Sequence, residues 1–82
     1  MHTLRLMALA GEFRTVATHE VATTDEARKL VETHAASGGY MRVKTADDGD
    51  GSLRFTATTP GGRAGRNVAF LDYGYPGDAE NA

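Results

Sequence analysis

Residues 11–45 constrain the fold more than any other part of the chain, because they carry the signals for a strand, a helix and a second strand in succession. Threonine and valine are frequent in residues 13–21, which is typical of a pleated surface. An amphipathic segment follows, and Ser-Gly-Gly separates it from the strand-like residues 40–45. This pattern predicts a small domain of the α+β class with one helix on a sheet.

The helix has the clearest boundaries of the predicted elements. Thr23 and Glu26 have the spacing of a capping box, in which each side chain accepts a hydrogen bond from a free backbone N–H group. Thr24 is the alternative N-cap, and Gly38 or Gly39 would supply the left-handed residue that ends the helix. One face is apolar at helical spacing. This face consists of Ala27, Leu30, Val31, His34 and Ala35.

The remaining strands follow from alternating patterns. Residues 2–10 are apolar at both alternating positions, which fits a strand buried on both faces or a short buried helix, and the strand-like segment that follows favours a strand. Residues 40–45 and 53–58 flank an Asp/Gly-rich turn, as in a β-hairpin. Residues 68–73 form a last strand, apolar on both sides. The predicted order is β–β–α–β–β–β, an antiparallel sheet with the helix across one face.

The hydrophobic core is expected between the helix and the sheet, where each large side chain contributes roughly 1.5–3 kcal/mol. Its expected members are Leu30, Val31, Phe13, Val43, Phe55 and Phe70. The opposite face of the sheet is expected to hold Val16, Leu71 and Tyr73. An apolar patch of this kind is typical of a protein–protein surface, and a homodimer would cover it. These three residues are therefore candidates for binding a protein partner.

A second set of candidates is basic. It consists of Tyr40, Arg42, Lys44 and Arg54 on the polar face of the predicted hairpin, with Arg63 and Arg66 in the Gly-rich residues 60–66. Cations and a ring on an exposed sheet can hold nucleic acid through phosphate contacts and base stacking, and the loop could cradle an anion. The alternative is a solvated strand face and a mobile loop. A net charge of −2 argues against nucleic acid.

Catalytic and metal-binding patterns are missing from the sequence. His2, His19 and His34 do not have the spacing of metal ligands, and His34 is expected at the edge of the core. The acidic residues 47–51 predict a hairpin turn rather than a calcium loop, because Thr58 stands where a glutamate would be required. We therefore expect no cofactor, no metal and no enzymatic activity.

Asp72 is unusual because it falls among the apolar positions of the last strand. Its carboxylate requires a partner such as Arg66, a backbone donor, or a place at the end of the strand in water, which is the favoured interpretation.

The length of 82 residues fits one domain, assigned to residues 1–76, with residues 77–82 as a disordered acidic tail. Cysteine is absent, no segment is long enough to cross a bilayer, and the N-terminus lacks a signal-peptide pattern, so a cytoplasmic protein is expected. The arginine-rich, isoleucine-free composition is typical of a GC-rich genome, such as that of an actinobacterium or its phage. For a phage protein, the expected location is the cytoplasm of the host.

These observations favour a small binding or regulatory protein that acts through a protein–protein surface. The alternative is a nucleic-acid-binding module that uses the basic hairpin face and the Gly/Arg-rich loop.

Overall fold

Five strands and one helix make up the part of the chain that the computed structural model describes, residues 2–49, 51–62 and 65–72. In sequence order they are β1 (His2–Met7), β2 (Thr15–Val21), α1 (Thr24–Ser37), β3 (Met41–Asp47), β4 (Ser52–Thr58) and β5 (Arg66–Asp72). The predicted α+β class and the β–β–α–β–β–β order are confirmed, and β1 is a strand rather than a short helix. The predictions for Arg63, Tyr73, the domain boundary at residue 76 and the tail 77–82 lie outside the described residues.

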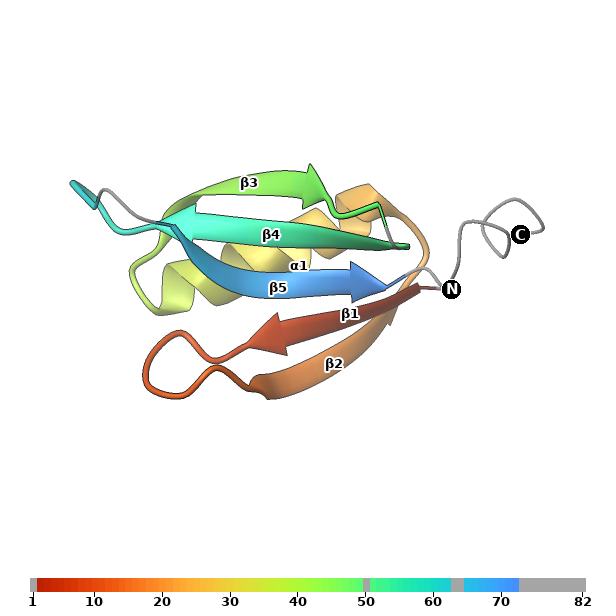
Figure 1. The fold of residues 1–82 in the computed structure, drawn as a ribbon, viewed down its shortest axis with the longest axis horizontal. Helices are drawn as coiled ribbons and strands as arrows, with labels where there is room; N and C mark the ends of the chain where they lie inside the picture. Colours follow the sequence, from red (N-terminus) through yellow and green to blue (C-terminus); the bar gives the residue numbers. More distant parts are fainter. Residues whose placement is uncertain (1, 50, 63–64, 73–82) are drawn as a thin grey trace.

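The strands form a single antiparallel sheet in the order β2-β1-β5-β4-β3. Because α1 connects β2 to β3, which are the two edge strands, the helix crosses one whole face of the sheet (Figure 1). We call the covered side the helix face and the other side the open face. The open face is where side chains of the sheet remain accessible to a ligand or partner.

The ends of α1 follow the local signals closely. The Thr23 hydroxyl accepts a hydrogen bond from the Glu26 N–H at 3.1 Å, which confirms Thr23 as the N-cap. The Glu26 carboxylate accepts in return from the Ala22 N–H at 3.4 Å, one residue before the usual position. At the other end, Gly39 takes the left-handed conformation with φ +80°, whereas Gly38 does not.

The core lies between α1 and the helix face of the sheet. Its buried members are Leu4, Leu6, Val21, Ala27, Val31, Ala35, Val43, Phe55, Ala57, Val68, Ala69 and Leu71, with Leu30 and Leu53 among the partly buried side chains packed against them. His34 lies at the edge of this core, as expected, with Nε2 2.7 Å from the Met7 carbonyl oxygen. The expected core positions of Val31, Val43 and Phe55 are confirmed.

Leu71 was wrongly assigned to the opposite face, because it is completely buried on the helix face. It pairs with Leu4 on β1 and with Leu53 on β4, which point to the same side. The reason is an irregularity in the β4–β5 pairing, where Phe55 faces Ala69 but the next residue, Thr56, faces Asn67. The extra residue, Val68, is buried together with Ala69, so alternation along β5 breaks at this point.

The two other aromatic candidates also lie outside the core, Phe70 because of this shift and Phe13 because it precedes β2. Phe70 alternates with Leu71 and therefore lies on the open face, where it is half-buried. Phe13 precedes β2, is 56% exposed, and packs edge-on against Phe70 with ring centroids 6.0 Å apart. The expectation that Phe13 and Phe70 belong to the core was therefore wrong.

Candidate functional site

The open face carries a row of cross-strand neighbours that runs over all five strands. Its members are Thr18, Arg5, Phe70, Arg54 and Ala46. In the middle of this row, the guanidinium carbon of Arg5 lies 5.3 Å from the centroid of the Phe70 ring. This is cation–π geometry, in which the planar guanidinium stacks on a ring face.

Asp72 holds the Arg5 guanidinium in that position. Its two carboxylate oxygens accept from Nε of Arg5 at 2.8 Å and from Nη2 at 3.3 Å. The partner of Asp72 is thus Arg5 rather than Arg66, and its place at the end of β5 is as expected. Because both side chains are about two-fifths exposed (41% and 38%), the pair contributes little to stability, but it orients Arg5.

Arg5, Phe13 and Phe70 form what we call the aromatic patch. Phe13, Val16 and Met41 are the exposed large apolar side chains among the described residues, with exposures of 56%, 43% and 48%. Phe13 and Val16 both belong to the β1–β2 hairpin. Of the residues predicted to bind a protein, Val16 is therefore exposed and Leu71 is not. Sequence reasoning missed the patch because it placed both rings in the core.

Arg66, predicted as an anion-binding residue, instead forms hydrogen bonds with the turn between β1 and β2. Its Nε donates to the Ala8 carbonyl at 3.0 Å, and its Nη2 donates to the Gly11 carbonyl at 3.2 Å. The guanidinium group of Arg66 therefore donates its hydrogen bonds within the fold rather than to a ligand.

Tyr40 and Arg54 also have intramolecular partners. The Tyr40 ring packs against the core, and its hydroxyl donates to the Leu9 carbonyl at 3.2 Å, so it is not a free stacking surface on the sheet. Arg54 lies on the open face as predicted, with Nη2 3.5 Å from an oxygen of Asp48. These contacts leave Arg42 and Lys44 as the predicted basic residues, within the described part of the chain, that carry no such partner.

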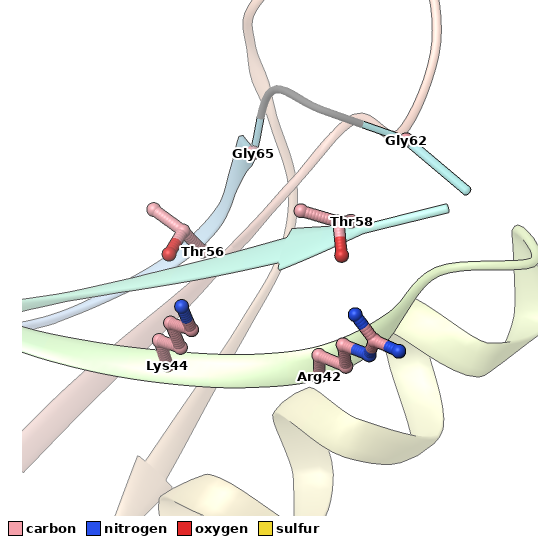
Figure 2. A pocket seen from close by; sticks show the side chains of 6 residues that line it. All are labelled: Arg42, Lys44, Thr56, Thr58, Gly62 and Gly65. Carbon is pink, nitrogen blue, oxygen red and sulfur yellow. The ribbon is translucent and has the colours of Figure 1, made fainter. Parts of the chain in front are cut away.

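A pocket of about 280 Å³ brings Arg42 and Lys44 together at the β3–β4 edge of the open face. Its lining consists of Arg42, Lys44, Thr56, Thr58, Gly62 and Gly65 (Figure 2). β3 supplies the two cations, β4 supplies the two hydroxyls, and the β4–β5 loop supplies the glycines. Sequence reasoning found the cations and the Gly-rich loop but missed the threonines, which the hairpin register places beside them.

The backbone at the mouth of the pocket is irregular. Arg42 has φ +59°, which is the left-handed region that side chains other than glycine rarely adopt. It occupies an irregularity in the β3–β4 pairing, where Met41 pairs with Thr58 and the register shifts before Lys44 pairs with Thr56. Such bulges redirect side chains, and this one brings Arg42 to the pocket beside Lys44.

Comparison of the chain with known protein families, with curated proteins and with solved structures finds no match. Within the described ranges, no helix is long and apolar enough to cross a membrane. Over these same residues, no three histidine or carboxylate side chains converge as metal ligands would. The function must therefore be argued from the aromatic patch and from the pocket.

Proposed function

We propose that this protein is a small, non-enzymatic binding module that acts through a protein–protein surface centred on the aromatic patch. The proposal rests on the exposure of Phe13, which is 56% exposed although its ring packs edge-on against Phe70. Aromatic rings and arginine are the side chains that most often supply binding energy at protein interfaces. The amino-acid usage is in keeping with an origin in an actinobacterium or its phage.

The aromatic patch is small, but the fixed position of Arg5 favours tight binding of a partner. Arg5 is held by Asp72 on one side and by the Phe70 ring on the other, so its rotamer is fixed before a partner arrives. A fixed side chain loses less conformational entropy on binding than a free one. The partner is either a second copy of the chain or a different protein, and both would cover Phe13.

Nucleic-acid binding is the second candidate, and Arg42 and Lys44 are the observation that favours it. These cations share one pocket on the open face and make no ion pair with another described residue. Arg54 and Arg66 are occupied within the fold, and the net charge is −2. Phosphate contacts would be few, so the protein surface is the stronger candidate.

The test compares Phe13→Ser with Met41→Ser, which removes a similarly exposed apolar side chain from β3. Size exclusion with light scattering gives the mass of each variant at low and high salt and so detects a homodimer. Affinity capture, followed by reconstitution with the purified partner, detects a complex with a different protein. We expect Phe13→Ser to abolish the dimer or the complex and Met41→Ser to retain it at both salts.

Equal behaviour of the two variants would contradict the proposal. A complex with mixed-sequence nucleic acid that forms at low salt and dissolves at high salt would favour the second candidate.

A further inference from the structure

The pocket at the β3–β4 edge is lined by two cations, two hydroxyls and two glycines, and none of the carboxylates in the described part of the chain lines it. We propose that it binds the phosphate group of a small phosphate monoester. This site is separate from the aromatic patch, and the inference does not depend on the protein-binding function.

The first argument is the state of the two cations. Several arginines of the described chain have partners within the fold: Arg5 with Asp72, Arg28 with Thr45 and the Val43 carbonyl, Arg54 with Asp48, and Arg66 with two carbonyls. Arg42 and Lys44 form no hydrogen bond or ion pair with another described residue, although both line the same pocket. Two adjacent like charges without a carboxylate repel one another, and a bound anion would relieve that repulsion.

The second argument is the arrangement of the donors. Lys44 and Thr56 are direct cross-strand neighbours, and Thr58 follows on the same face of β4. Figure 2 shows Arg42 and Lys44 extending from β3 towards β4, with the hydroxyls of Thr56 and Thr58 close to them. Donors from two strands approach the pocket from different directions. A tetrahedral phosphate accepts hydrogen bonds in several directions, whereas a planar carboxylate accepts them in one plane.

The third argument is the space that the pocket keeps open. A Cβ atom at Gly65 would lie 3.5 Å from the Cβ of Thr56, in van der Waals contact with another lining residue, so glycine keeps this wall of the pocket free of a side chain. The volume of about 280 Å³ is at the small end for ligand sites, so the pocket can hold a phosphate group together with the adjoining part of its substituent. The left-handed Arg42 adds backbone strain at the same place, which is common at ligand sites.

The experiment is an NMR titration of the backbone amides of the 82-residue chain at constant ionic strength. The probes are inorganic phosphate, a nucleoside monophosphate, the same nucleoside without phosphate, and a short single-stranded oligonucleotide. We expect saturable shifts for inorganic phosphate and for the monophosphate, confined to the start of β3, the end of β4 and Gly62 and Gly65, and none for the nucleoside.

Two variants and one control assign the site. Lys44→Gln is expected to weaken monophosphate binding at least about tenfold, because it removes one charge-assisted hydrogen bond. Lys29→Gln removes the same charge from the exposed side of α1 and should leave binding unchanged. Arg42→Gly should also weaken binding. Because glycine accepts the left-handed conformation, the melting temperature of this variant should not fall. A lost site is thereby distinguished from a lost fold.

Three results would overturn the inference. One is the absence of saturable shifts with either phosphate probe. Another is an equal loss of binding in Lys29→Gln and Lys44→Gln, which would show general charge attraction. The third is an oligonucleotide that binds far more tightly than the monophosphate, with shifts over the whole open face. A failure of the Phe13→Ser test would leave all of these results unaffected.

Discussion

Phe70 and Leu71 are adjacent in β5 but have opposite environments. Leu71 is completely buried against β1 and β4, whereas Phe70 supports the exposed Phe13 on the open face. Leu71 therefore belongs to the core, whereas Phe13 presents the exposed ring of the proposed binding surface. Substitution of each residue measures these separate roles.

We expect Leu71→Ala to lower the free energy of unfolding by about 2–5 kcal/mol, because it leaves a cavity among packed side chains. Phe13→Ala should change it by less than about 1 kcal/mol, since the ring is 56% exposed. Urea denaturation followed by circular dichroism measures both. A larger loss for Phe13→Ala than for Leu71→Ala would contradict this assignment of faces.

Arg42 offers a prediction of the opposite sign. Its φ of +59° is unfavourable for a side chain with a Cβ atom, and glycine relieves that strain. After the greater freedom of glycine in the unfolded chain is subtracted, Arg42→Gly should raise the free energy of unfolding by about 0.5–1 kcal/mol. Arg42→Ala is the control, because it removes the same guanidinium but keeps the strain. Thermal unfolding of both variants should rank glycine above alanine.

The helix α1 is the element whose ends are most fully specified by nearby residues. Thr23, Glu26 and Gly39 lie within or beside it, and their hydrogen bonds and dihedral angles involve only close neighbours in sequence. Such contacts depend only on residues that are close in sequence and not on the rest of the fold. For this reason the boundaries of α1 could be predicted from the sequence, although the choice between Thr23 and Thr24 required the structure.

The two candidate caps can be distinguished by substitution. Thr23→Ala should lower the free energy of unfolding by about 1 kcal/mol, because the Glu26 N–H loses its acceptor. Thr24→Ala is the matched control within the first turn and should have a smaller effect, since alanine is a favourable helix residue. Chemical denaturation of both variants provides the comparison, and an equal loss would argue against Thr23 as the cap.

On the scale of the whole molecule, β5 is the central strand and α1 spans the sheet from one edge strand to the other (Figure 1). Arg66, at the start of β5, reaches the carbonyls of Ala8 and Gly11 across sequence separations of 58 and 55 residues. The last strand thus fixes the turn of the first hairpin. Because Phe13 lies in that turn, this contact also helps to position the aromatic patch.

Removal of this long-range contact should loosen the turn. In Arg66→Gln, we expect faster hydrogen exchange at the Ala8 amide, which donates to the Arg14 carbonyl at 2.8 Å in the same turn. Arg14→Gln is the control, because it removes an exposed arginine from the turn while the Arg66 contacts remain. Exchange measured by NMR should separate the two variants, and unchanged protection in Arg66→Gln would contradict the role assigned to Arg66.

The sequence by itself determined the α+β class, the order of the elements, the boundaries of α1, and the presence of Arg42 and Lys44 on one strand. These features depend on caps, turns and alternation, which act over a few residues. Only the tertiary structure decided the positions of Phe70 and Leu71, because a single extra residue at Val68 exchanges the faces of the strand beyond it. It also decided that Asp72 pairs with Arg5, 67 residues away, and that the threonines of β4 join the two cations in one pocket. Pairing between distant segments sets these contacts, and no local pattern encodes it.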